Sequence, residues 1–351
     1  MLDYLRPSIR AMAGYAPGEQ PREGVFVKLN TNENPYSPSP RVFAALREAL
    51  TGDRLRKYPD PTGTHFRQTA GRILSVDPEG ILIGNGSDDV LTILTRAFVP
   101  EGGLIASLTP SYLLYSSLAQ IQGARYQAAS FTDDWGLPEP WPVERADLTF
   151  VANPNSPSGT AVGTAEIEKV RARLRGPLVV DEAYADFADE NALDLVRRGG
   201  RGANVVVTRS LSKSYSLAGI RFGFAVADPV LVRELNKVKD SYNCDVLSLA
   251  AAAAALEDQD YLRETRAKIL ATRKRMTAAL AKLGFTVCPS QANFVWCQRT
   301  DRPVKPIYEE LKRRHLLVRY IAYEGYGDGL RISVGTDGEI DRLLEELRTI
   351  L

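Results

Sequence analysis

Residues 208–224 have the sequence TRSLSKSYSLAGIRFGF, which places one lysine, Lys213, among four serines. Apolar segments lie on both sides, and Arg221 follows eight residues after the lysine. A lysine on a solvated surface normally has charged neighbours, so this setting indicates a lysine that takes part in chemistry. The alternative is an ordinary exposed loop lysine, and residues elsewhere in the chain must decide between the two.

The length and charge of the chain limit the class of protein. Its 351 residues suffice for one or two domains with a large core. The 44 Lys and Arg residues nearly balance the 43 Asp and Glu residues, so no overall field favours nucleic acid or an anionic membrane as a partner. His65 and His315 lie far apart, so we expect neither a metal site nor a histidine-based triad.

The N-terminal residues and the cysteines bear on location. The first 15 residues lack the apolar core of a signal peptide, and no apolar run is long enough to span a bilayer. The three cysteines have neither an even count nor a paired spacing, which is typical of a reducing compartment. We therefore predict a cytoplasmic protein with no membrane role.

From about residue 80 onward, short apolar runs alternate with helical patterns. Examples are ILIGN followed by SDDVLTILTRAF, and ADLTFVAN followed by TAEIEKVRARL. This alternation predicts an α/β fold in which helices cover both faces of a mostly parallel sheet. Toward the C-terminus long helices are expected at 247–256 and 261–283. We expect a large domain at 30–255, and a smaller α+β domain formed by residues 1–29 and 256–351.

An open parallel sheet binds ligands in the crevice outside the carboxyl ends of its strands. Polar residues that directly follow the apolar runs are therefore the best candidates for a binding site. We expect one crevice to contain Gly86, Ser87, Tyr112, Asn155, Asp181, Tyr184, Ser210, Ser212 and Lys213.

Asp181 and Lys213 together point to a particular cofactor. Asp181 ends the apolar run in GPLVVDEAY, where desolvation would raise its pKa unless a cation lay against it. The protonated ring nitrogen of pyridoxal 5′-phosphate is such a cation. Lys213, with its pKa lowered by desolvation and nearby cations, could form a Schiff base with the aldehyde of this cofactor and later carry a proton. A structural ion pair between Asp181 and an arginine is the alternative.

The phosphate of this cofactor would need several donors. The segment GNGSDD places Ser87 at the start of a predicted helix, where backbone N–H groups bind anions, although a plain helix cap is also compatible with it. The segment lacks the third glycine of a dinucleotide-binding loop, so we reject a Rossmann interpretation. We expect the phosphate site to contain Gly86, Ser87, Asp88, Ser210, Ser212 and Arg221.

Two tyrosines suit the cofactor ring. Tyr112 could stack on the face of the ring, and Tyr184 could donate a hydrogen bond to its phenolic oxygen. Either tyrosine could instead be an aromatic residue of the core.

A series of motifs extends this interpretation from about Asn30 to the C-terminus. The series is LNTNENPYSPSP, RKYPDPTG, GNGSDD, TPSY, NPNSPSG, VVDEAY, TRSLSKSYSLAGIRFGF and GLRISVG. In order and approximate spacing the chain resembles the fold-type I, class II pyridoxal-phosphate aminotransferases, most closely the histidinol-phosphate aminotransferases. The resemblance implies a sheet of the seven-stranded type sandwiched by helices, together with the smaller α+β domain.

The resemblance also implies roles for individual residues. Lys213 would be the Schiff-base lysine, and Asp181 the partner of the pyridine nitrogen. Tyr184 would donate to the cofactor O3′ atom, and Arg221 would bind the phosphate. Tyr58, in RKYPDPTG, would reach the phosphate of a neighbouring subunit, so the resemblance implies a homodimer.

The activity implied by the resemblance is amino transfer between a small amino donor and a 2-oxo acid. The implied pair is L-histidinol phosphate and 2-oxoglutarate, in histidine biosynthesis. Two enzymes of the same fold remain as alternatives, an aromatic amino acid aminotransferase and a threonine-phosphate decarboxylase. A non-catalytic pyridoxal-binding module of a transcription regulator is a further alternative, but no basic helix-turn-helix precedes the motifs.

The turn NPNSPSG departs from the usual pattern. The family often has an asparagine directly before the Pro-Ser/Thr-Gly of this turn, where it bonds the cofactor O3′ atom. This chain has Ser156 at that place and Asn155 one residue earlier. The sequence leaves open which of the two contacts the cofactor.

Substrate recognition would need cations beyond those that hold the cofactor. Arg331, in GLRISVG, has a forked guanidinium that suits a carboxylate such as that of glutamate. Arg319, in LLVRYIAY, is the candidate for a phosphate on the amino donor. The resemblance adds Tyr15 as a phosphate contact, with packing as the alternative, and Asn32 of the motif LNTNENPYSPSP as a substrate contact.

Overall fold

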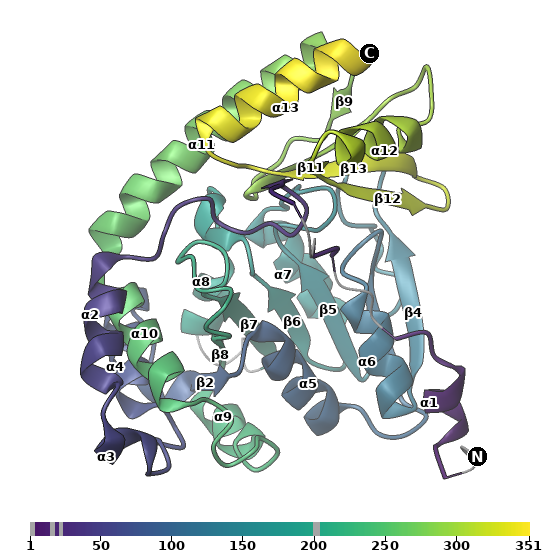
Figure 1. The fold of residues 1–351 in the computed structure, drawn as a ribbon. Helices are drawn as coiled ribbons and strands as arrows, with labels where there is room; N and C mark the ends of the chain where they lie inside the picture. The colour runs from purple at the N-terminus through teal and green to yellow at the C-terminus, as the bar shows by residue number, and fades with distance from the viewer. Residues whose placement is uncertain (1–3, 15–17, 21–23, 199–203) are drawn as a thin grey trace.

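A large sheet forms the centre of the molecule (Figure 1). The computed structural model describes residues 4–14, 18–20, 24–198 and 204–351. Within this part of the chain, the large sheet has seven strands. In spatial order they are β2 (Ile81–Gly84), β8 (Gly223–Val226), β7 (Val205–Ser210), β6 (Leu178–Asp181), β5 (Leu148–Ala152), β3 (Leu104–Thr109) and β4 (Arg125–Ser130).

The strand directions bring several strand ends to one edge of the sheet. Strands β3 to β7 run parallel to one another, whereas β8 is antiparallel to both of its neighbours, β7 and β2. The prediction of a mostly parallel sheet is thereby confirmed. The reversal at β8 follows from its connection, because residues 211–222 contain no crossover helix that could return the chain in parallel.

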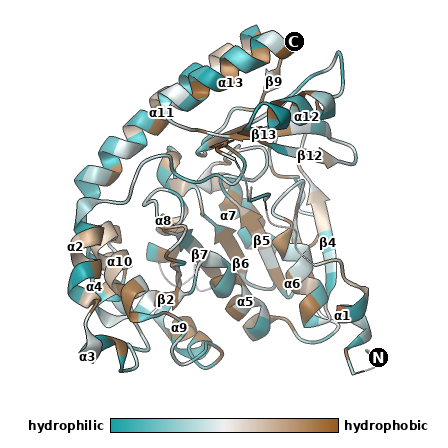
Figure 2. Cartoon of the chain, viewed as in Figure 1, coloured by the Kyte–Doolittle hydropathy of each residue, from teal (hydrophilic) through white to brown (hydrophobic). Residues whose placement is uncertain are grey.

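Helices cover both faces of this sheet, which explains its near-continuous apolar strands. Val206 of β7 packs in the core beneath α5, α6 and α9, whereas Val205 and Val207 belong to the core on the other face. Figure 2 shows hydrophobic residues concentrated on the central strands. The first face carries α5 (Ser87–Phe98), α6 (Leu114–Gln122) and α9 (Pro229–Leu235), and the second carries α4 (Thr64–Leu74), α7 (Thr164–Arg173), α8 (Leu193–Arg197) and α10 (Val246–Glu257).

A second, antiparallel sheet builds a separate core near the C-terminus. Its strand order is β12 (Arg319–Tyr323), β13 (Gly327–Ser333), β10 (Phe294–Gln298) and β9 (Thr286–Val287). It packs with α11 (Gln259–Lys282), α12 (Lys305–Arg313) and α13 (Asp337–Ile350). Figure 1 shows this unit above the large sheet, with α11 extending from it toward α2 (Pro40–Ala49) and α10.

The N-terminal segment joins this second core. Strand β1 (Val27–Lys28) pairs in parallel with β11 (Leu316–Leu317), and Leu29 packs among the buried residues of the second core. On this pairing we propose the division into a large domain at 30–255 and a small domain at 1–29 and 256–351. Among the residues that the structure describes, no helix has both the length and the apolar character required to cross a membrane.

Candidate active site

A cavity of about 350 Å³ opens at the edge where the parallel strands end. Its walls come from the loops after β2, β3, β5, β6 and β7, and from β12 and β13 of the second sheet. This is the crevice expected for an open parallel sheet. The residues predicted for the site that line it are Asn32, Ser87, Asp88, Tyr112, Asp181, Tyr184, Ser210, Ser212, Lys213, Arg221, Arg319 and Arg331.

Asp181 is a buried carboxylate whose partners are hydroxyl groups. Tyr115 Oη donates a hydrogen bond to Oδ2 at 2.8 Å, and Thr208 Oγ1 donates one to Oδ1 at 3.0 Å. Burial raises the pKa of Asp181, and the two hydroxyls partly oppose this. No lysine or arginine in the described part of the chain forms an ion pair with it, so the structural alternative is disfavoured. A protonated pyridine nitrogen fits this donor set, because it would supply the cation that a buried carboxylate requires.

Tyr115 and Thr208 were not anticipated from the sequence. Thr208 lies directly opposite Asp181 in the register of β6 and β7. Tyr115 lies on α6, fully buried, and stacks on Phe150 with ring centroids 4.6 Å apart. The only signal for Tyr115 was its place three residues after Tyr112, a spacing that brings side chains together in a helical turn.

Lys213 extends into the same cavity from the loop after β7. Its Nζ atom donates to the backbone oxygen of Thr31 at 3.1 Å. Asn34 Nδ2 holds the lysine segment from outside by donating to the backbone oxygens of Lys213 and Ser214, each at 3.1 Å. Burial, followed by the charge of Arg331, lowers the pKa of Lys213 to about 8. The amine is therefore closer to its neutral, nucleophilic form at physiological pH than an exposed lysine is.

An anion cup lies at the start of α5. Ser87 begins the helix after Gly86, whose φ of 88° favours glycine, and backbone N–H groups at a helix start attract anions. Arg221 Nη1 donates to Ser212 Oγ at 3.4 Å, and Arg221 Nη2 lies 4.0 Å from Asp88 Oδ2. A phosphate fits this set, because the helix start, the hydroxyls and the guanidinium could all bind its oxygens.

Glycine is required at Gly86 for a second reason. A Cβ atom there would lie 2.6 Å from Arg221 Nη2, so a side chain would displace the guanidinium. Gly86 itself does not line the cavity, and its expected contact with the cofactor stays a prediction.

The two tyrosines assigned to the ring are both held by neighbours. Tyr112 Oη donates to Asp88 Oδ1 at 3.2 Å, and its ring packs edge-on against Tyr115. Tyr184 Oη accepts a hydrogen bond from Asn32 Nδ2 at 3.0 Å. Asn32 thus lines the cavity next to Tyr184, the tyrosine assigned to the cofactor ring.

The turn NPNSPSG presents Ser156, and not Asn155, to the cavity. Asn155 Nδ2 donates to the backbone oxygen of Pro110 at 3.0 Å and to Ser158 Oγ at 2.9 Å. Its Oδ1 atom accepts from Ser111 Oγ at 2.8 Å. Both N–H donors of Asn155 thus hold the loop and Asn155 does not line the cavity, so its expected contact with the cofactor stays a prediction.

Two arginines of the second sheet face this cavity side by side. Arg319 on β12 and Arg331 on β13 are directly opposed cross-strand partners, so their side chains lie on the same face of the sheet. Arg331 Nη1 donates to Ser156 Oγ at 2.9 Å, and its Nη2 donates to the backbone oxygen of Asn30 at 3.1 Å. Like charges placed this closely favour a ligand that carries negative charge.

Two predicted residues lie away from the cavity or outside the described chain. Tyr58 is 81% exposed and stacks on Tyr242 with ring centroids 4.4 Å apart. Its predicted contact with a neighbouring subunit stays a prediction. Tyr15 lies outside the described residues.

Comparison with known proteins relates this geometry to a family. The family described as "Aminotransferase class I and II" matches residues 25–347. The histidinol-phosphate aminotransferase of Rhodopirellula baltica is 52% identical over 339 residues, which cover 96% of this chain and 92% of the relative. That of Geotalea uraniireducens is 49% identical and covers 99% of both chains. A crystal structure of the Sinorhizobium meliloti histidinol-phosphate aminotransferase, in complex with pyridoxal 5′-phosphate, has a TM-score of 0.89 at 27% identity and covers 100% of this chain and 99% of that one.

Proposed function

Because the chain belongs to the class I and II aminotransferases, we propose that it transfers the amino group of L-histidinol phosphate to 2-oxoglutarate, with pyridoxal 5′-phosphate as cofactor. The observation that carries the proposal is the cross-strand arginine pair, Arg319 and Arg331, in the same cavity as Lys213 and Asp181. One side of the cavity thus suits the cofactor and the other suits substrate anions. This reaction belongs to histidine biosynthesis.

When bound, the cofactor supplies an aldehyde that takes up amino groups and a ring that accepts electrons from the substrate α-carbon. Asp181 would keep the ring nitrogen protonated, and its own hydrogen bonds with Tyr115 and Thr208 hold the carboxylate in place. Tyr184 would hold a proton at the phenolic oxygen of the ring. The cup formed by Ser87, Ser210, Ser212, Arg221 and the start of α5 would bind the phosphate.

Lys213 would have two tasks. Its amine would hold the cofactor by the aldehyde, and Nζ would move a proton at the substrate α-carbon. The pKa of about 8, lowered by burial and by Arg331, suits both tasks near neutral pH. The hydrogen bond from Nζ to the oxygen of Thr31 holds the amine inside the cavity.

Arg331 and Arg319 would divide the anions of the substrate. Arg331 is anchored on the Ser156 side of the cavity, and its fork would bind the carboxylate of glutamate or 2-oxoglutarate. Arg319 would bind the phosphate of histidinol phosphate. An aromatic amino acid would leave Arg319 without that anion, so the site should discriminate against it.

The experiment is a steady-state comparison of amino donors with the purified, cofactor-loaded enzyme. We expect kcat/KM for histidinol phosphate to exceed that for phenylalanine and tyrosine by a factor on the order of 10² or more, since sites built for a polar group reject analogues that lack it. Equal use of phenylalanine would favour the aromatic aminotransferase. Release of carbon dioxide from threonine phosphate would favour the decarboxylase.

Assembly and location complete the proposal. We propose a homodimer in which Tyr58, largely exposed in the single chain, reaches the phosphate in the other subunit. We also propose a cytoplasmic location, which rests on the cysteine pattern and agrees with the three free thiols of Cys244, Cys288 and Cys297.

A further inference from the structure

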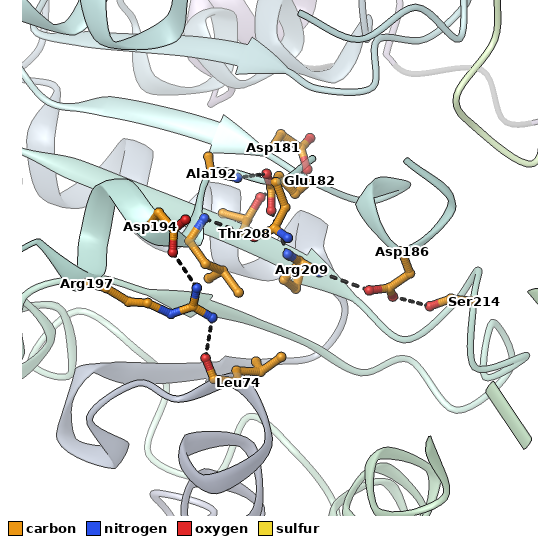
Figure 3. Close-up of polar contacts among 12 residues, drawn as sticks. Leu74, Asp181, Glu182, Asp186, Ala192, Asp194, Arg197, Thr208, Arg209 and Ser214 are labelled. Carbon is orange, nitrogen blue, oxygen red and sulfur yellow. Dashed lines mark hydrogen bonds and ion pairs between the residues drawn. The ribbon is translucent and has the colours of Figure 1, made fainter. Parts of the chain in front are cut away.

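A buried ion-pair network lies behind the candidate active site (Figure 3). Thr208 of β7 binds Asp181, and Ser210 lines the cavity. Arg209 stands between them, so the alternation of side chains along a strand places it on the opposite side of the sheet. There Arg209 is 7% exposed and lies against Glu182, which is 1% exposed.

The network joins three segments of the chain. Arg209 Nη2 lies 2.8 Å from Glu182 Oε2, and Arg209 Nη1 lies 2.9 Å from Asp186 Oδ1. Asp186 also accepts a hydrogen bond from Ser214 Oγ, and Glu182 accepts one from the backbone N–H of Ala192. One guanidinium therefore connects β7 to the segment after β6 and, through Asp186, to the segment after β7.

The members of this network are sequence neighbours of the residues assigned to the cofactor. Because the peptide bond is rigid, fixing one residue strongly limits where the next can lie. Glu182 directly follows Asp181, Asp186 lies two residues after Tyr184, and Ser214 directly follows Lys213.

We propose that Arg209 is a positioning residue, which through Glu182, Asp186 and Ser214 fixes the separation between the Asp181 carboxylate and the Lys213 amine. The cofactor ring is rigid, so the groups at its nitrogen and at its aldehyde must be held at a matching distance. Net stability is a weak reason for such a network, because desolvation offsets most of the attraction in a buried ion pair. A forked guanidinium bound to two carboxylates sets distances, which a single ammonium would not.

The mild test is Ser214→Ala, which removes one hydrogen bond and leaves the contacts of Arg209 intact. The stronger test is Arg209→Met, which breaks both ion pairs. The control is Arg197→Met, because Arg197 pairs with Asp194 on the surface nearby and has no contact with the network (Figure 3). The proposal rests on the proposed cofactor chemistry. The affinity for the cofactor and the absorption spectrum are therefore measured without substrate, so that an error in the assigned amino-donor substrate cannot affect them.

Five quantities are compared among the variants: the melting temperature of the cofactor-free protein, the Kd for pyridoxal 5′-phosphate, the absorption maximum of the loaded protein, kcat and KM. For Ser214→Ala we expect kcat to fall about tenfold and the absorption maximum to shift, with KM nearly unchanged, since misplacement of a reacting group acts on turnover. Arg209→Met should show the same changes to a larger extent. Arg197→Met should leave the spectrum and kcat unchanged.

The proposal is overturned if Ser214→Ala lowers only the melting temperature and leaves the spectrum and kcat as in the wild type. That result would make the network purely structural. If the Arg209→Met variant fails to fold, the Ser214→Ala variant alone tests the proposal. If the wild type binds the cofactor with the expected spectrum but does not use histidinol phosphate, the substrate assignment fails and the spectral comparison still stands.

Discussion

Gly223 allows the start of helix α5 to approach strand β8 at the phosphate cup. A Cβ atom at position 223 would lie 2.4 Å from Ser87 N, 2.7 Å from Gly86 C and 2.9 Å from Ser87 Cα. All three are backbone atoms, so no flexible side chain can move aside. Non-bonded contacts require about 3.5 Å, so Gly223→Ala should displace the start of α5 by roughly 1 Å.

This displacement should weaken binding of the cofactor phosphate. Overpacking by one methyl group costs about 1–3 kcal/mol of folding free energy, which in a chain of this size lowers the melting temperature by about 1–2 °C per kcal/mol. A shift of roughly 1 Å lengthens phosphate hydrogen bonds beyond their useful range. Because hydrogen bonds to charged groups contribute about 1.5–3 kcal/mol each, losing one should raise the Kd of pyridoxal 5′-phosphate by about tenfold to a hundredfold.

The assay is equilibrium binding of pyridoxal 5′-phosphate and of pyridoxal, which lacks the phosphate. In Gly223→Ala the ratio of the two Kd values should shift against the phosphorylated form. Gly219→Ala is the matched control, because a Cβ atom there meets no atom within 4 Å. An unchanged ratio, or an equal shift in Gly219→Ala, would refute the assignment of the cup to the phosphate.

Lys213→Ala should lower turnover by orders of magnitude, while cofactor binding weakens less. In the cofactor-free wild type, the labelling of Lys213 by an amine reagent should rise through about pH 8, since burial and Arg331 lower the pKa of Lys213 to about 8. A labelling midpoint at the ordinary lysine value of 10.5 would contradict that environment. Arg319→Ala should lower kcat/KM for histidinol phosphate by about tenfold to a hundredfold, with little effect on kcat/KM for glutamate. Arg331→Ala should impair both half-reactions. Equal effects of Arg319→Ala on both amino donors would contradict the role assigned to Arg319. Light scattering should give twice the chain mass of 38.6 kDa. Tyr58→Ala should weaken cofactor binding only if Tyr58 of one subunit contributes to the site of the other. A fully active monomer would rule out this contribution of Tyr58.

Much of the fold follows from hydrophobic periodicity. The segment SDDVLTILTRAF forms α5 with the expected bounds, because a glycine precedes it and its apolar residues repeat at helical spacing. The edge strand β4 was not expected, since its sequence RYQAAS is mostly exposed and carries no apolar run. Strand β12 was missed for the same reason, as its residues are only partly buried. The direction of β8 depends on its helix-free connection to β7, which the periodicity of the strand alone does not specify.

The site was predictable where it depends on strand ends. Ser87, Asp181 and Lys213 each follow an apolar strand, so the rule for parallel sheets placed them together. Contacts set by register or by packing were not predictable, which is why Tyr115 escaped notice. The choice between Asn155 and Ser156, which the sequence left open, likewise depends on side-chain hydrogen bonds within the turn, because these decide which residue faces the cavity.

The cations around the cavity also link substrate binding to proton transfer. Arg331 is, after burial, the largest cause of the lowered pKa of Lys213. A substrate carboxylate bound to Arg331 would cancel part of the repulsion that the lysine ammonium experiences, so Nζ would become a stronger base. By thermodynamic reciprocity, protonation of Nζ would in turn tighten the hold on the anion. A substrate that carries a carboxylate, such as glutamate, would thus raise the basicity of the amine that takes its proton, and release of the product anion would lower it again.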